Sequence, residues 1–402
     1  MRILIVSNCE AFVGGIETYI RALVPHLLNA KHDVCLMFEV PSGERSESDF
    51  EPAPGLSIAT TALTLDQVLQ WRPDVVYSQG LADDGLETQL ANAIPTVRFA
   101  HGYSGTCISG TKCFSNAGYK TCRRTLGPAC LACYFPLGCG GTNPFTMLTL
   151  YWTQLRRRRE FARFRALLVA SRHMAEEYRR NGVNADRLHL LPLFPPEIAP
   201  DASPPTSRPR TDRVLFVGRL VALKGALQLV DVIAKAGAAL GRPLTLVVAG
   251  EGNEKDAVRE QARTRSVNVE FLGYVDAERR TREMRKADLL LVPSLWPEPF
   301  GLVGIEAGCV GLPAAGYRKG GISDWLRPGQ TGESPAETSS NPDELAAAVV
   351  KALADDDHWN HLRLGAWKAS QEYGATRHVD KLTQILQGAA DVRSGDNLAT
   401  AS

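Results

Sequence analysis

Short apolar runs alternate with stretches of helical periodicity along most of this chain, and that alternation constrains its fold more than any other feature. In the first half, segments typical of strands occur at residues 3–6, 34–38, 74–77 and 97–100, and apolar side chains at helical spacing follow the first of them. Strands and helices that alternate in this way form a parallel sheet covered by helices on both faces. The first half therefore predicts a doubly wound α/β domain.

The same alternation restarts after a proline-rich stretch. Six prolines lie between residues 195 and 210, and such a segment builds neither helix nor sheet, so we interpret it as an interdomain linker. A chain of 402 residues also exceeds what one hydrophobic core usually serves. We predict two Rossmann-like doubly wound domains that face each other across a cleft, with ligands at the carboxyl ends of the strands.

Composition excludes some classes of protein. Apolar residues make up 44% of the chain and charged residues 22%, as in an ordinary packed protein, and the net charge of +1 gives no overall field that would attract nucleic acid. The apolar run at the start is too short for a signal peptide, and no run is long enough to span a bilayer. We expect a cytoplasmic protein that does not bind nucleic acid, and peripheral membrane contact stays open.

The first cluster of chemically active residues occupies positions 218–225, directly after an apolar run and before a helical segment. Gly218 allows a close backbone approach, and a helix start presents free N–H groups to an anion. Arg219 offers a forked donor to phosphate oxygens, and Lys224 offers a mobile positive charge. This pattern predicts a diphosphate site. The alternative is a plain strand-to-helix turn with two solvated cations.

The second cluster lies at residues 297–308. Glu298 precedes a helical segment on what we expect, as for Lys224, to be an exposed cleft loop, and Glu306 follows inside that helix among apolar neighbours. The amides of Phe300, Gly301 and Leu302 lie at the helix start and predict a second anion cradle. Alternatively, Glu298 only complements the helix dipole and Glu306 is a solvated face residue. A charge among apolar neighbours is costly without a partner, which favours a functional Glu306.

These two clusters, in this order, resemble the retaining glycosyltransferases of family four (group 1), which have the GT-B fold. The resemblance covers nearly the whole chain. It implies transfer of a sugar from a nucleotide-diphosphate donor, UDP- or GDP-linked, to a hydroxyl acceptor of unknown identity, with no cofactor for catalysis. It also implies that Arg219 and Lys224 hold the diphosphate, that Glu298 binds sugar hydroxyls and that Glu306 binds the ribose hydroxyls.

The resemblance extends to the first half of the chain. It implies that the loop with Gly14 and Gly15 approaches the donor, and that His101, at the end of an apolar run, lies near the transferred sugar. We predict an N-terminal domain over residues 1–196, a donor domain over residues 197–374, and a last segment, 375–402, whose helix packs back on the N-terminal domain and whose tail after Ala389 is disordered.

Other classes of protein are alternatives to a glycosyltransferase. A dinucleotide dehydrogenase needs Gly-x-Gly-x-x-Gly after the first strand, and the loop with Gly14 and Gly15 lacks that pattern. Phosphorylases need a pyridoxal lysine and a much longer chain. An epimerase-like enzyme or a non-catalytic binding module of the same fold stays as an alternative.

A cysteine-rich insert interrupts the α/β pattern at residues 102–143. Six of the nine cysteines fall here, and two of them have the Cys-x2-Cys spacing that suits tetrahedral zinc. We predict a structural zinc ion that folds a segment lacking a hydrophobic core, with free or disulfide-linked thiols and an iron–sulfur cluster as alternatives. Four of the following would be the ligands: Cys107, Cys113, Cys122, Cys130, Cys133 and Cys139.

The remaining cysteines and a run of arginines have plainer interpretations. Cys9, Cys35 and Cys309 are expected to be small core residues. The run at residues 156–159 could dock on anionic lipid, but we favour a solvated helix face.

Overall fold

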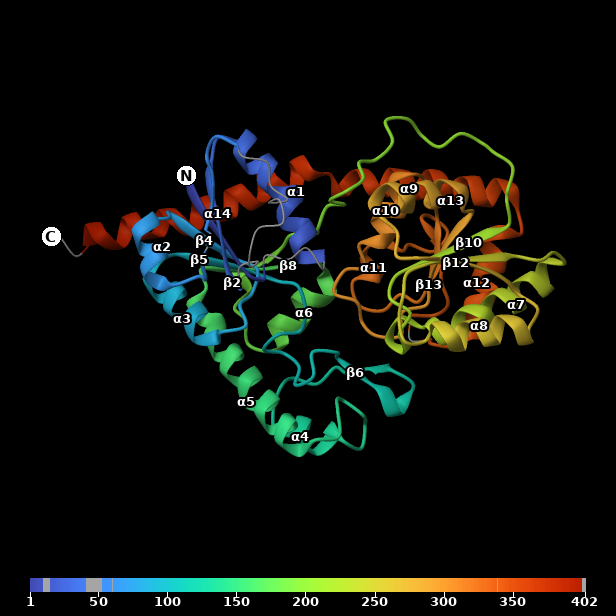
Figure 1. The fold of residues 1–402 in the computed structure, drawn as a ribbon, viewed down its shortest axis with the longest axis horizontal. Helices are drawn as coiled ribbons and strands as arrows, with labels where there is room; N and C mark the ends of the chain where they lie inside the picture. Colours follow the sequence, from blue (N-terminus) through green and yellow to red (C-terminus); the bar gives the residue numbers. More distant parts are fainter. Residues whose placement is uncertain (10–14, 41–52, 60, 338, 400–402) are drawn as a thin grey trace.

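The computed structural model describes residues 1–9, 15–40, 53–59, 61–337 and 339–399. Two α/β domains lie side by side, and a smaller lobe formed by the insert extends below the N-terminal domain (Figure 1). Both domains are built on parallel sheets, so the predicted pair of doubly wound domains is confirmed. Within the described residues, helices of a length and apolarity that could cross a bilayer are absent.

The N-terminal sheet has seven parallel strands in the order β3-β2-β1-β4-β5-β8-β9. Ile3, Leu4 and Val6 of β1 are fully buried because helices cover both faces of the sheet. The strands are β1 (Arg2–Cys9), β2 (Asp33–Val40), β3 (Leu56–Ile58), β4 (Val75–Ser78), β5 (Thr96–Ala100), β8 (Ala166–Val169) and β9 (Leu188–Leu190). The helices of this domain are α1 (Gly15–Asn29), α2 (Leu65–Trp71), α3 (Asp84–Ala93) and α6 (Arg172–Arg180).

The C-terminal sheet has six parallel strands in the order β12-β11-β10-β13-β14-β15. Its strands are β10 (Arg213–Val217), β11 (Thr245–Ala249), β12 (Asn268–Gly273), β13 (Leu289–Val292), β14 (Ala314–Gly316) and β15 (Gly332–Glu333). Its helices are α7 (Leu229–Leu240), α8 (Lys255–Thr264), α9 (Ala277–Lys286), α10 (Val303–Cys309), α11 (Ile322–Trp325), α12 (Pro342–Leu353) and α13 (Asp356–Ser370). The order reverses between β10 and β13, which places the ligand site of such a sheet beyond their carboxyl ends.

The last helix, α14 (Ala375–Ala399), returns to the N-terminal domain (Figure 1). Leu382 and Leu386 are buried in a core shared with α1, and His378 Nε2 lies 2.8 Å from the Tyr19 hydroxyl. The helix continues beyond Ala389, where we expected a disordered tail. No proline follows Ala389, so nothing in the local sequence forces the helix to end there.

The insert contains a short hairpin, β6 (Cys113–Phe114) and β7 (Lys120–Thr121), and the helix α4 (Ala129–Tyr134); α5 (Pro144–Glu160) follows it directly. Our expectation that this segment lacks a core is wrong. Ile108, Leu126 and Tyr134 of the insert form a small buried cluster with Tyr151 of α5. The insert thus has apolar packing to hold it together, which weakens the argument that a metal must do so.

Candidate active site

Two loops meet at the carboxyl edge of the C-terminal sheet. They follow β10 and β13, which are neighbouring strands. Gly225 ends the first loop with φ +74°, and a Cβ atom there would lie 2.0 Å from the carbonyl oxygen of Pro293. Glycine is therefore required for the loops to approach this closely.

This approach brings Lys224 and Glu298 together. Lys224 Nζ lies 2.6 Å from Glu298 Oε1, and the Ser294 hydroxyl donates to the same oxygen at 2.6 Å. Glu298 is only 5% exposed, whereas 27% of the Lys224 side chain is exposed. The expectation that both lie on exposed loops is therefore wrong for Glu298. The Gly321 amide donates a hydrogen bond to the Glu298 carbonyl and so fixes the loop, while Lys224 fixes the side chain. The carboxylate is therefore positioned before any ligand binds.

Glu306 lies in the first turn of α10 and is 7% exposed. Arg280 Nη2 of α9 lies 3.3 Å from its carboxylate and 2.8 Å from Glu197 of the linker. Burial raises the pKa of Glu306, and the positive charge of Arg280 opposes that rise. Glu306 is thus not a solvated face residue; it is a buried acid that shares one cation with a second acid.

The other residues predicted to bind the donor lie around this edge. Arg219 is exposed just after β10, and Gly218 before it passes close to Gly250, where a Cβ atom would lie 2.0 Å from the Gly218 carbonyl oxygen. Phe300 is buried, Gly301 has φ +79°, and Leu302 leads into α10. Their roles toward a ligand stay predictions.

His101 lies in the N-terminal domain, at the end of β5. Its Nε2 is 2.8 Å from the Gln79 amide oxygen, and its ring stacks on Phe99 at 4.5 Å between centroids. Burial lowers the pKa of His101 to about 3, and nearby Arg98 adds to the effect. The imidazole is therefore neutral at physiological pH, which suits a hydrogen-bonding group better than a proton carrier. Gly15 begins α1, and Gly14 lies outside the described residues.

Among the site residues predicted from the sequence, Lys224 and Glu298 contact each other directly. Arg219, Glu306 and His101 lie on separate elements. Sequence reasoning missed two supporting residues, Ser294 and Arg280. Ser294 could have been found, because it lies between an apolar run and Glu298. Arg280 could not, because only the packing of α9 on α10 brings it to Glu306.

The N-terminal domain contacts the Glu298 loop directly. The Tyr103 hydroxyl donates to the Pro297 carbonyl at 2.6 Å, and the Ser171 hydroxyl donates to the Pro299 carbonyl at 2.6 Å. These bonds hold the two domains against each other on both sides of Glu298. No sequence motif marks Tyr103 or Ser171, so these contacts could not be predicted from the sequence.

The six cysteines of the insert are free thiols. Burial raises the pKa of Cys139 to about 12, and the neighbouring Cys107, Cys122, Cys130 and Cys133 add to the rise, so several thiols are near one another. Yet among the residues that the structure describes, no three ligating side chains are placed to hold a metal ion. The positions of the cysteines therefore do not fit the structural zinc site predicted from sequence spacing alone. Metal analysis of purified protein tests whether the insert binds zinc. Cys35 and Cys309 are buried as expected, and the side chain of Cys9 lies outside the described part of the chain.

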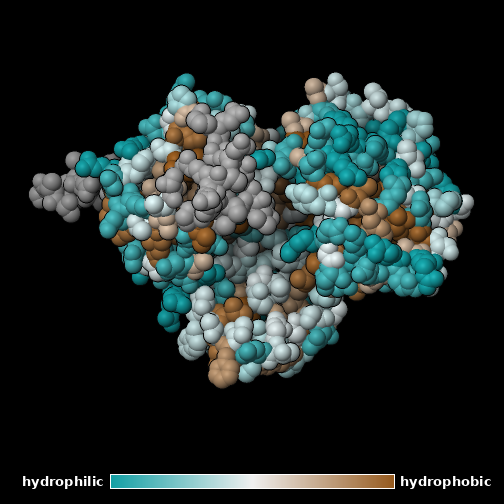
Figure 2. All heavy atoms as spheres, viewed as in Figure 1, coloured by the Kyte–Doolittle hydropathy of each residue, from teal (hydrophilic) through white to brown (hydrophobic). Residues whose placement is uncertain are grey.

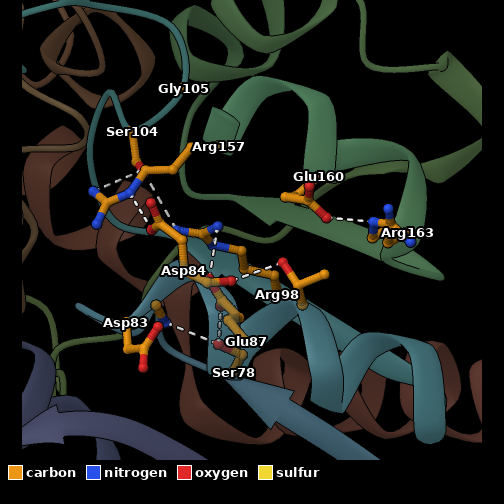
Figure 3. A network of polar contacts seen from close by, with 12 residues as sticks. Ser78, Asp83, Asp84, Glu87, Arg98, Ser104, Gly105, Arg157, Glu160 and Arg163 are labelled. Atoms are coloured by element: carbon orange, nitrogen blue, oxygen red, sulfur yellow. Dashed lines mark hydrogen bonds and ion pairs between the residues drawn. The ribbon is translucent and has the colours of Figure 1, made fainter. Parts of the chain in front are cut away.

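The arginine run does not form one solvated face. Arg157 Nε lies 2.6 Å from Asp84, as Figure 3 shows, and Arg158 donates to the Leu126 carbonyl oxygen. Only Arg156, at 63% exposure of its side chain, and Arg159 face solvent. The run therefore has two parts, one that anchors α5 to α3 and the insert, and one that faces outward.

The same network reaches the strand that carries His101. Arg98 of β5 lies 3.0 Å from buried Glu87 of α3, and the Ser78 hydroxyl donates to Glu87 at 2.5 Å (Figure 3). Charged groups this deeply buried are stable only when paired. Their pairing fixes the end of β5 and so the position of His101.

Two Rossmann-like doubly wound domains are the architecture of the GT-B class, and comparison of structures agrees. HepE of Anabaena, solved in complex with UDP, superimposes with a TM-score of 0.64 at 18% identity over 96% of this chain and 100% of that one. Sucrose-phosphate synthase of Thermosynechococcus elongatus superimposes with a TM-score of 0.66 at 19% identity over the whole of both chains.

Sequence comparison identifies the family. The model of Glycosyltransferase Family 4 matches residues 13–194, and that of Glycosyl transferases group 1 matches residues 201–366. The chain belongs to the family-4, group-1 glycosyltransferases.

Individual relatives match only in part. A glycogen synthase of Mycobacterium tuberculosis is 37% identical over 161 residues, which are 37% of this chain and 36% of that protein. A phosphatidyl-myo-inositol mannosyltransferase of Mycobacterium leprae is 31% identical over 189 residues, 44% of each chain. The chain thus matches less than half the length of these relatives.

Proposed function

We propose that this protein is a retaining glycosyltransferase that moves a sugar from a nucleotide-diphosphate donor, UDP- or GDP-linked, to a hydroxyl acceptor. The contact that carries the proposal is the 2.6 Å pair between Lys224 and buried Glu298, at the point where the strand order of the C-terminal sheet reverses. The complex of HepE with UDP, a protein of the same fold, supports a nucleotide ligand.

Each residue has a proposed task. Arg219 and Lys224 stabilise the negative charge that develops on the leaving diphosphate, with the helix starts at this edge. Glu298 exchanges its contact with Lys224 for the sugar hydroxyls when donor binds, which frees the lysine for phosphate. Glu306 accepts hydrogen bonds from the ribose hydroxyls, and neutral His101 donates to or accepts from the transferred sugar.

Substitution of Glu298 by glutamine tests this proposal. Glu298→Gln keeps the shape of the side chain but removes its charge, so we expect donor hydrolysis or transfer to fall about 100-fold or more. The donor is first identified by a thermal-shift screen of UDP-, GDP-, ADP- and TDP-sugars, because a ligand of the native state raises the melting temperature.

The matched control is Glu278→Gln, at an acid that is 82% exposed on α9. It should leave activity unchanged. Full activity of a folded Glu298→Gln protein would remove the site assignment. Donor binding to the unaltered protein without hydrolysis or transfer to any hydroxyl acceptor would favour the non-catalytic alternative.

We also propose that the enzyme works at a membrane surface. Phe145, Leu148 and Trp152 are spaced along one face of α5 and are 78%, 41% and 61% exposed. Arg156 continues that face; 63% of its side chain is exposed, although its Nε lies 3.8 Å from Asp84. Hydrophobic surface is visible on the tip of the lobe that the insert forms (Figure 2). Exposed aromatic residues beside arginine fit an anionic lipid surface, with the rings at headgroup depth.

The location of the reaction is part of the same proposal. Eight described cysteines are free thiols, which suits a reducing compartment such as the cytoplasm. An acceptor presented at the inner surface of a membrane would meet the donor there.

A further inference from the structure

A cavity of about 930 Å³ lies between the insert, α6 and the C-terminal domain. The β6–β7 hairpin forms one wall, and it lies below the C-terminal domain in Figure 1. Tyr119 at the tip of that hairpin packs against the core of the C-terminal domain. The insert therefore does not hang free; it closes one side of the space between the domains.

The walls of this cavity carry excess positive charge. Two acids line it, and Glu177 is already compensated, because Lys112 Nζ lies 2.7 Å from one of its oxygens and Arg180 Nη1 lies 2.9 Å from the other. The second acid is Glu337. The five cationic residues of the lining are Lys120, Arg123, Arg180, Arg318 and Lys319. A cavity lining on which one sign of charge is in excess concentrates ligands of the opposite sign.

Two polar atoms in the lining have no partner. Arg318 Nε and His173 Nε2 are buried from solvent, and within the described residues neither has a hydrogen-bond partner. A buried polar atom without a partner costs free energy, so water or a ligand is expected to supply the missing hydrogen bond. Arginine in particular matches the oxygens of phosphate and carboxylate groups. Both residues line the same cavity: His173 belongs to the N-terminal domain and Arg318 to the C-terminal domain.

The cavity adjoins the proposed donor site. Gly320 lines it and pairs with Glu298 in a short bridge, and Lys319 Nζ donates to the Leu295 carbonyl at 3.0 Å on the same loop. The ring of His173 packs edge-on against Tyr103, whose hydroxyl bonds to Pro297. A molecule in this cavity would therefore lie next to the residue that we propose binds the transferred sugar.

We infer that this cavity binds the acceptor and that the acceptor carries an anionic oxygen group, a phosphate or a carboxylate. The anion contacts Arg318 and His173, with Lys120 and Arg123 of the hairpin around it. The inference rests on the proposed function, because only a transferase needs an acceptor beside its donor. It assigns the insert a role in choosing the acceptor.

Calorimetric titration tests the inference without knowledge of the natural acceptor. The full chain is first saturated with UDP so that the donor diphosphate site is occupied. Glycerol 1-phosphate and glucuronate are then titrated, with glycerol and glucose as their neutral counterparts. We expect at least one of the two anions to bind and neither neutral compound to bind; the anion that binds identifies the group. Failure of both anions to bind overturns the inference.

Variants assign the binding to the cavity. Arg318→Gln should weaken binding of the anion about tenfold or more and leave UDP affinity unchanged. The double variant Lys120→Gln with Arg123→Gln, on the exposed hairpin, gives the same test if Arg318→Gln does not fold. Arg282→Gln, 55% exposed on α9, is the matched control. Anion binding that is equal in all these proteins overturns the inference.

The same titration separates the two proposals. If UDP and nucleotide sugars do not bind the unaltered protein, the proposed function fails. Titration of the anions in the absence of UDP then still measures whether the cavity binds an anion.

Discussion

At the scale of single residues, the two predicted acids have different electrostatic surroundings. Glu298 has a lysine and a serine hydroxyl at 2.6 Å, so its charge is well compensated although it is buried. Glu306 is equally buried but shares Arg280 with Glu197, and burial raises its pKa. An acid kept in a costly position is expected where a ligand needs it, because function and stability often conflict at binding sites.

This contrast gives a prediction for Glu306→Gln. Since burial raises the pKa of Glu306, its ionised form costs stability at pH 7, and a neutral amide of the same shape removes that cost. We expect a melting temperature equal to or above that of the unaltered protein, together with UDP affinity weakened roughly tenfold by loss of a charged acceptor. Thermal unfolding and calorimetry measure the two effects. A protein that loses stability but keeps its UDP affinity would show a structural role only.

At the scale of elements, α14 connects the domains through a few buried contacts. His378 is 4% exposed, and its Nδ1 lies 2.7 Å from the Pro192 carbonyl, which requires a donated proton. Its Nε2 is then free to accept from the Tyr19 hydroxyl. Both ring nitrogens are thus used by the neutral imidazole, and burial lowers the pKa of His378 to about 4.

The low pKa of His378 predicts a pH-dependent stability. The pKa of His378 in the folded protein lies below the ordinary value of about 6.5. The contribution of the neutral imidazole to the free energy of unfolding is therefore complete above pH 6.5 and is lost as the pH falls toward 4. Between pH 7 and pH 5 the unfolding free energy of the unaltered protein should fall by about 2 kcal/mol more than that of His378→Gln. Urea unfolding at both pH values measures this. An equal loss in both proteins would mean that His378 does not titrate on unfolding.

At the scale of the whole molecule, the insert links three features: the exposed face of α5, the cationic cavity and the loop that carries Glu298. Its hairpin reaches the C-terminal domain, and its Lys112 forms a fully buried ion pair with Glu177 of α6. A membrane-bound acceptor could therefore approach along the insert and place its anionic group beside the donor. The route depends on the tertiary structure, because α5, the cavity and the Glu298 loop are far apart in sequence.

Vesicle binding tests the membrane part of this arrangement. The chain should sediment with vesicles that contain about one third phosphatidylserine, and less with neutral vesicles or at high salt. Trp152→Ser combined with Phe145→Ser should abolish sedimentation, because two exposed aromatic anchors are lost, and should leave UDP affinity intact. As a control, Leu227→Ser replaces another exposed apolar residue, 39% exposed in the C-terminal domain. Self-association that disappears in the double variant, without lipid binding, would instead identify a protein interface.

Much of the fold and part of the site follow from the sequence. Buried parallel strands read as apolar runs, and the loop motifs with Lys224 and Glu298 sit directly after two of them, so local pattern was enough to place both at one sheet edge. The split of the arginine run and the apolar core of the insert were not predictable. Arg157 and Arg159 have the same charge and neighbours in sequence, and only the position of Asp84 separates them.

The sequence by itself determined the two doubly wound domains and the family, because each depends on periodicity and spacing along the chain. The tertiary structure alone decided which charges are paired, that Glu298 is buried, and that the insert closes a cationic cavity against the second domain. The physical reason is that burial and ion pairing depend on contacts between residues far apart in sequence, which no local pattern encodes.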